Sequence, residues 1–246
     1  MRMPNNRTRM ATLCAVLALQ ALPVRADSAF MMNPGAFANQ MAIPSVMSRL
    51  ERSHETIFGE SVSESLSRSK LQATKQVAPS RSPSFTPAAG LKPAQDLVSA
   101  YPAAMRADVE RLFKELLAGY HKIEDQFGIP RYDVGAAVAA FLAGSYMAYR
   151  DVDFPDRQFM PLVQQMRQVL AGNAAFARAS NAQKQALYEQ MAILGTYMAL
   201  TRDALKQRPD ARVEQKMRQA AKGYLEQFLD VSADRVQITD QGMVLR

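Results

Sequence analysis

Apolar side chains recur at helical spacing from residue 94 to the C-terminus. In the clearest stretch, residues 102–128, they step by three, four and one residues and therefore share one face of a helix. Pro102 suits the first turn of this helix, and Gly128 ends it. The apolar face consists of Met105, Val109, Leu112, Phe113, Leu116, Leu117, Tyr120, Ile123 and Phe127.

Four further helices are predicted after the first. Residues 133–150 are apolar almost throughout and rich in glycine and alanine, which indicates a central helix that its neighbours approach closely. This stretch is too short and too rich in alanine to favour a membrane span. A third helix spans residues 158–171. The fourth begins with a capping box at Ser180 and extends to Leu205, and the fifth spans residues 210–229.

These elements define the expected fold class. Long amphipathic helices with short connections favour antiparallel neighbours. Residues 94–246 are therefore predicted to form an all-α domain, an antiparallel bundle of about five helices. Residues 236–245 alternate around a glycine-containing turn, which predicts a small C-terminal β-hairpin.

The region before the bundle has a different composition. Residues 59–93 contain many serines and prolines and few large apolar side chains, so they bury too little surface to offset the entropy of ordering. We predict a disordered linker here. Residues 27–58 form an apolar, methionine-rich arm, in which residues 45–58 predict a short helix. The arm suits docking on a partner because methionine adapts to irregular surfaces, and an ordinary loose terminus is the alternative.

The first 26 residues have the pattern of a secretory signal peptide. Three arginines precede an apolar run from Met10 to Leu22, and small or apolar residues lead up to Ala26. We expect cleavage after Ala26 and export to the periplasm or the medium. The apolar run is too short for a membrane anchor, so no membrane span is expected after cleavage.

Charge and cysteine content narrow the chemistry. The formal net charge of +7 falls to +3 when the four arginines of the leader are removed. The remaining charges are interspersed, whereas nucleic-acid-binding proteins concentrate basic residues on one face, so no nucleic acid is expected. The single cysteine, Cys14, lies in the leader. The mature chain is therefore expected to have no disulfide, no thiolate zinc site and no other cofactor.

The densest polar and aromatic cluster of the bundle is a candidate ligand site. It consists of Tyr146, Tyr149, Arg150, Asp151, Asp153 and Asp156. Its aspartates are oxygen donors that calcium accepts, although the glycine and the distal glutamate of an EF-hand are missing. In the alternative interpretation, Asp156 caps the third helix and Arg150 pairs with an adjacent acid.

His121 and Glu124 are the candidates for acid–base chemistry. The alternative for His121 is a surface pair with Asp125, four residues on. No repeated Glu-x-x-His pattern supports a metal site between helices. The bundle tyrosines either line a ligand groove or complete the edge of the core with their hydroxyls at the rim. They are Tyr120, Tyr146, Tyr149, Tyr188, Tyr197 and Tyr224.

Three segments carry a family resemblance. They are 119–130 (GYHKIEDQFGIP), 139–155 (AAFLAGSYMAYRDVDFP) and 220–229 (AAKGYLEQFL). Together with residues 30–34 (FMMNP), they resemble an uncharacterised family of exported bacterial proteins, defined only as a domain of unknown function. The resemblance covers roughly residues 95–245. It implies bacterial origin, export and a helical domain, and it carries over no activity and no catalytic residues.

Three functions fit these patterns. The first is an exported, non-enzymatic interaction or scaffold protein whose arm engages an unknown protein partner or a second copy. The second is a periplasmic protein that binds a small molecule or an envelope fragment through residues 146–156. The third is a hydrolytic enzyme with an acid–base site near His121.

Overall fold

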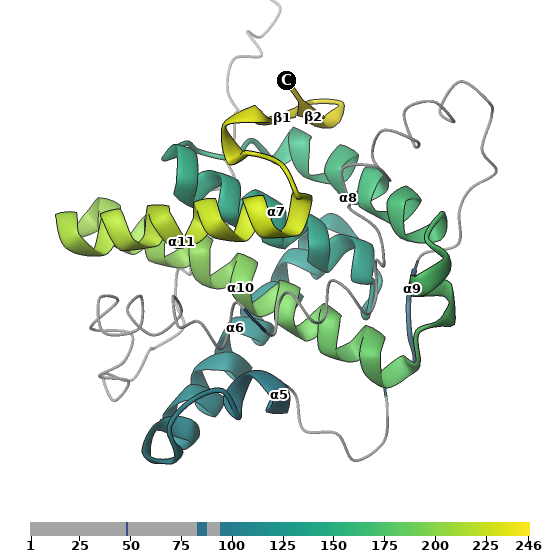
Figure 1. Ribbon diagram of the computed structural model, residues 1–246, viewed down its shortest axis with the longest axis horizontal. Coiled ribbons are helices and arrows are strands. Elements are labelled where there is room, and N and C mark those ends of the chain that lie inside the picture. Colours follow the sequence, from purple (N-terminus) through teal and green to yellow (C-terminus); the bar gives the residue numbers. More distant parts are fainter. Residues whose placement is uncertain (1–47, 49–82, 88–93) are drawn as a thin grey trace, which may run out of the picture.

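The computed structural model describes residue 48, residues 83–87 and residues 94–246 (Figure 1). The predicted leader, residues 1–26, lies outside the described residues. So does the predicted arm, residues 27–58, except for Ser48, which lies in a helix. Of the predicted linker, residues 83–87 are described, and they lie against the helical domain.

The five predicted helices are present in the described residues, and two short helices and two 3-10 turns add to them. In chain order the elements are α5 (Gln95–Val98), η1 (Ala103–Met105), α6 (Arg106–Phe127), α7 (Val134–Arg150), α8 (Asp156–Ala171), α9 (Ala174–Arg178), α10 (Asn181–Gln207), α11 (Ala211–Leu229), η2 (Ala233–Arg235), β1 (Val236–Thr239) and β2 (Gly242–Leu245). The predicted all-α bundle with a C-terminal hairpin is confirmed.

Helix α7 is the centre of the bundle, as its small apolar residues predict. It packs against α8, α10 and α11, and α6 packs against α10 from the other side (Figure 1). Helices α7 and α10 approach each other closely at Gly144 and Gly195, where a Cβ atom on either residue would overlap the backbone of the other helix. Glycine at these two positions allows the helices to cross in backbone contact.

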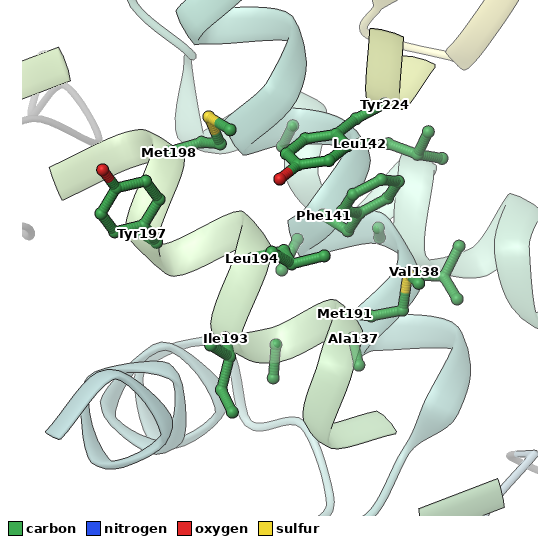
Figure 2. Close-up of a cluster of buried hydrophobic side chains, with 14 of the residues drawn as sticks. Ala137, Val138, Phe141, Leu142, Met191, Ile193, Leu194, Tyr197, Met198 and Tyr224 are labelled. Carbon is green, nitrogen blue, oxygen red and sulfur yellow. The ribbon is translucent and has the colours of Figure 1, made fainter. Parts of the chain in front are cut away.

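Large side chains fill the space around this crossing. Figure 2 shows side chains of α7, α10 and α11 that meet around Phe141 and Tyr224. The two rings are 6.1 Å apart, and Phe141 also lies 5.3 Å from Phe228. All three residues are fully buried. Burial of such rings is the main source of stability in a core of this kind.

Polar caps fix where the helices begin. The Asp133 carboxylate accepts a hydrogen bond from the backbone N–H of Ala136 at 3.1 Å and caps α7. The capping box predicted at Ser180 is confirmed, because Ser180 and Gln183 satisfy each other's backbone N–H groups. Such caps satisfy N–H groups that have no partner inside the helix.

The C-terminal hairpin pairs β1 with β2 in antiparallel register, with Val236 opposite Leu245. Gly242 begins β2 with a φ of 99°, which glycine adopts without strain. The side-chain amide of Gln165 holds the hairpin on α8. It donates to the Met243 carbonyl at 2.9 Å and accepts from the Met243 N–H at 2.7 Å.

Among residues 48, 83–87 and 94–246, no helix combines the length and the apolar character needed to cross a bilayer.

Candidate functional site

Two buried carboxylates lie where α6 ends and α7 begins. Gly128 ends α6 in the left-handed conformation, and Asp133 begins α7 as its cap. The chain reversal between them brings Glu124, Arg131 and Asp133 together with side chains of α8 and α10. We call this set the polar network, and its members are Glu124, Arg131, Asp133, Arg167 and Tyr188.

The Glu124 carboxylate is fully buried. It accepts hydrogen bonds from Arg131 Nη1 at 2.7 Å and from the Tyr188 hydroxyl at 2.8 Å. Burial raises the pKa of Glu124, and the hydrogen bonds from Arg131 and Tyr188 offset part of that rise. The predicted acid–base residue is thus held by a cation and a hydroxyl in the interior of the bundle.

His121 occupies a different environment from the predicted one. Asp125 accepts two hydrogen bonds from Arg131, at 2.7 and 2.8 Å, so its partner is this arginine and not His121. Arg131 also donates to the His121 carbonyl at 2.5 Å. The His121 Nε2 atom is buried without a hydrogen-bond partner among the described residues. Burial and the nearby Arg131 lower the pKa of His121, which favours the neutral imidazole.

The second carboxylate, Asp133, is also fully buried. One oxygen caps α7, and the other pairs with Arg167 of α8 at 2.6 Å. Each buried acid of the polar network therefore has its own arginine. Charge pairing of this kind holds helices in a fixed arrangement, since removal of either partner leaves a buried charge uncompensated.

Residues 83–87, which we call the strap, lie on top of the polar network. Ser84 forms an isolated antiparallel bridge with Asp133, and the Pro83 carbonyl accepts a hydrogen bond from the N–H of Val134 at 3.1 Å. The Phe85 side chain is only 7% exposed. Its ring lies 5.3 Å from Tyr132 and 5.5 Å from Tyr188. The rings of Tyr132 and Tyr188 also contact each other, 6.1 Å apart, and we call the surface that the two form against Phe85 the aromatic slot.

The strap differs from the disordered linker predicted for residues 59–93. The prediction rested on average composition, in which serine and proline dominate. Phe85 departs from that composition, because it is a large apolar side chain between Pro83 and Pro87. An aromatic residue in such a segment was the signal that this part of the chain docks.

Four of the six predicted ligand residues at 146–156 take part in two structural contacts, and they are Tyr149, Arg150, Asp151 and Asp153. Arg202 of α10, which is 4% exposed, donates to Asp151 at 3.1 Å and to Asp153 at 2.9 Å. On the other side, Tyr149 donates to Asp234 at 2.6 Å. We call the first of these contacts the Arg202 clasp, and it joins the α7–α8 loop to α10.

The contacts of this loop contradict both parts of its alternative interpretation. Arg150 pairs with Asp234, through the carbonyl at 2.7 Å, and not with an adjacent acid. Asp156 is the first residue of α8 and makes no capping hydrogen bond, so its predicted role as the cap is wrong. One of its oxygens is buried without a partner among the described residues, and burial raises the pKa of Asp156. Tyr146 is half-buried against the core.

Four of the six bundle tyrosines do not place their hydroxyls at the rim of the core, whereas Tyr149 does. Tyr120, Tyr188, Tyr197 and Tyr224 are all buried, and burial raises the pKa of each one. Within the described part of the chain, no three His, Cys, Asp or Glu side chains are placed to hold a metal ion.

An open depression of about 520 Å³ runs along the exposed face of α6. Its charged side chains belong largely to pairs within the helix, such as Lys114 with Glu110 at 2.8 Å. The depression is lined by Ala107, Glu110, Arg111, Lys114, Glu115 and Ala118. One helix face of mixed charge offers no convergent chemistry.

Comparison with known proteins identifies the family of this chain. The model of a family of unknown function, DUF6683, matches residues 7–246, so the chain belongs to that family. No curated protein matches the chain. No solved structure matches it either.

Proposed function

We propose that this member of DUF6683 is an exported, non-enzymatic interaction protein. In this proposal the helical bundle is a rigid scaffold, and the arm, residues 27–58, engages a protein partner or a second copy. The leader pattern at residues 1–26 supports export. The docking of the strap is the observation that carries the scaffold role.

The strap fixes where the N-terminal region leaves the bundle. Phe85 is packed against Tyr132 and Tyr188, and the nearby Pro83 carbonyl accepts a hydrogen bond from the N–H of Val134. The chain that precedes residue 83 is therefore tethered at the junction of α6, α7 and α10. A fixed tether keeps the arm close to the bundle and raises its effective concentration at any surface that both contact.

The partners of the candidate acid–base groups support a non-enzymatic role. Glu124 is fully buried and bound by Arg131 and Tyr188, whereas a general acid or base must reach a substrate proton. Asp151 and Asp153 are engaged by Arg202. These contacts join elements of the bundle to one another, as expected for a scaffold.

Deletion of the arm tests this proposal. Mature protein, residues 27–246, is compared with the same chain lacking residues 27–58, by sedimentation velocity and by capture of partners from an envelope extract. We expect the deletion to abolish the capture of partners, or to weaken self-association, and to leave the melting temperature of the bundle unchanged. Capture and self-association that are both unchanged without the arm, or a mature protein that associates with nothing, would overturn the proposal.

Export is tested separately. The full chain and a variant with Ala26→Lys are expressed with a C-terminal tag, and the N-terminus of the fractionated product is sequenced. We expect the full chain to appear outside the cytoplasm beginning at Asp27, and the variant to retain its leader, because cleavage requires a small residue before the cut. A full chain that stays in the cytoplasm with Met1 would contradict export.

A further inference from the structure

The aromatic slot has the properties of a receptor for extended peptide. Val134 is the first residue of α7, so its N–H has no partner within the helix and is satisfied by the Pro83 carbonyl. Both oxygens of Asp133 are occupied inside the bundle, one by the cap and one by Arg167. The slot therefore recognises a ring and an extended backbone, and it offers no free charge to its ligand.

The strap lies at the molecular surface, with its Pro83 and Phe85 side chains buried and the other three exposed. Ser84, Thr86 and Pro87 are exposed, and Tyr132, which forms one wall of the slot, is 39% exposed. Among the described residues, the strap backbone is joined to the bundle by one isolated bridge, between Ser84 and Asp133, and the hydrogen bond from Val134 to Pro83 belongs to this bridge. This is less pairing than a strand of a sheet would provide. Segments held this lightly open locally without unfolding of the core.

We propose that the aromatic slot is an exchangeable peptide-docking site that accepts the strap of a second copy. Its ligand is an extended segment with an aromatic side chain between two prolines, of which Pro83–Pro87 is the example. This inference rests on the proposed function, because it names the second copy as a partner and places the contact.

The connection to the bundle permits this exchange. Six residues separate Pro87 from Ala94, and they span at most about 20 Å. The N–H of Ala94 is anchored on Glu189 at 2.6 Å, and Glu189 adjoins Tyr188 of the slot. A strap released from its own slot thus stays tethered beside that slot, and it makes the same contacts when it enters the slot of another copy. Exchange of an identical segment needs no new complementarity.

The tether also explains why a chain fills its own slot first. A covalent connection of only six residues gives the strap an effective concentration in the millimolar range or above at its own slot. A second copy competes only when a slot is empty or when copies are concentrated. The inference is therefore tested best with one chain that lacks the strap ring and one that lacks the slot.

Two complementary variants of the mature chain provide this test. The receiver carries Phe85→Ala and has an intact, empty slot. The donor carries Tyr132→Gly and has an intact strap with no slot of its own. Glycine is chosen because Tyr132 has a φ of 65°, which glycine adopts without strain. Tyr132 is partly exposed and Phe85 lies in the strap, so each change leaves the five long helices intact, and circular dichroism checks that each variant is folded.

We expect the mixture to form a 1:1 complex in native mass spectrometry and sedimentation, beyond any association of either variant alone. Hydrogen exchange at the Val134 amide of the receiver should slow on mixing, because the Pro83 carbonyl of the donor covers it. A wild-type receiver, whose own strap competes, should bind the donor at least about tenfold less tightly. A chain that carries both changes should bind neither variant.

The outcome is separable from that of the proposed function. Deletion of residues 27–58 from both variants should leave this complex unchanged, although it removes association that depends on the arm. A synthetic peptide of residues 79–91 should displace the donor, and the same peptide with Phe85→Ala should not. Two folded variants that sediment in mixture as each does alone would overturn the inference, whatever the arm binds.

Discussion

The hydroxyl of Tyr188 on α10 donates a 2.8 Å hydrogen bond to the fully buried carboxylate of Glu124 on α6. Tyr188→Phe removes this donor and leaves the carboxylate with less hydrogen bonding in the interior. We expect the free energy of unfolding to fall by about 1–3 kcal/mol. Urea denaturation of wild type and variant at neutral pH measures the difference.

Tyr120→Phe is the matched control for that change. Tyr120 is equally buried and its ring lies 5.7 Å from that of Tyr188, but its hydroxyl has no hydrogen-bond partner among the described residues. Its loss should leave the free energy of unfolding unchanged or slightly raised, since a buried unpaired hydroxyl is itself unfavourable. Equal losses from the two substitutions would show that the hydroxyl of Tyr188 has no special role.

The raised pKa of the buried Glu189 predicts that the stability of the fold depends on pH. Glu189 is 7% exposed and accepts hydrogen bonds from the N–H of Ala94 at 2.6 Å and from Gln185 at 2.9 Å. Burial raises its pKa above the ordinary value of 4.5, and these hydrogen bonds offset part of the rise. The folded protein therefore holds the proton more tightly than the unfolded chain, so ionisation of Glu189 costs stability as pH rises through the raised pKa.

Glu189→Gln removes this ionisation and keeps the side-chain shape. We expect the variant to gain stability relative to wild type between about pH 4, where Glu189 is protonated in both states, and pH 7. Other carboxyls with raised pKa values, such as Glu124 and Asp203, are present in both proteins and cancel in the comparison. A stability difference that is the same at the two pH values would contradict the raised pKa.

The elements that were predicted correctly from the sequence are those that the spacing of apolar residues within one segment determines. Apolar steps of three and four residues locate the five long helices, and the capping box at Ser180 marks a helix start that the structure confirms. Alternation around Gly242 locates the hairpin. Helix α9 has only five residues, too few to show a period, and its cap at Asn173 was not recognised.

The polar network escaped prediction because its pairs are remote in the chain. Glu124 meets a tyrosine 64 residues away, and Asp133 meets an arginine 34 residues away. Spacing along one helix suggested instead that His121 pairs with Asp125, a local contact that Arg131 replaces. Periodicity identifies which face is buried, but the partner of a buried charge depends on which helices pack together.

The crossing of α7 and α10 depends on glycine. A Cβ atom at position 195 would lie 2.5 Å from the carbonyl oxygen of Ala140, which is backbone and cannot rotate away. We expect Gly195→Ala to lower the free energy of unfolding by about 2 kcal/mol or more through this overlap. The helix propensity of alanine, worth about 1 kcal/mol over glycine, offsets only part of the loss.

Gly172→Ala is the control for the glycine substitution. Gly172 follows α8 with a φ of −82°, and a Cβ there would meet its nearest neighbour at 3.5 Å, an ordinary contact. The melting temperature of the Gly172→Ala variant should equal that of the wild-type protein or lie slightly above it. If Gly195→Ala melts at the same temperature as Gly172→Ala, the two helices do not cross in backbone contact.

The Arg202 clasp predicts that Asp151 and Asp153 stabilise the bundle by pairing with Arg202. Asp151→Asn with Asp153→Asn removes two charges from an arginine that is 4% exposed and leaves it Asp203 at 3.7 Å. Asn is chosen because Asp151 has a φ of 52°, which Asn tolerates. We expect a loss of about 2 kcal/mol, less than for a fully buried pair because Asp151 and Asp153 are 60% and 48% exposed.

Thermal shift with and without calcium distinguishes this clasp from a cation site. Because both carboxylates already bind Arg202, we expect calcium to leave the melting temperature of the wild-type protein unchanged. Asp234→Asn is the control, since it removes an exposed charge 3.9 Å from Arg150 and leaves the hydrogen bond from Arg150 to the Asp234 carbonyl in place, so the melting temperature should change little. A calcium-dependent rise that disappears in the double variant would instead make residues 151–153 a cation-binding loop. That result would favour a ligand-binding function over the scaffold, because the aspartates would leave Arg202 to coordinate the ion.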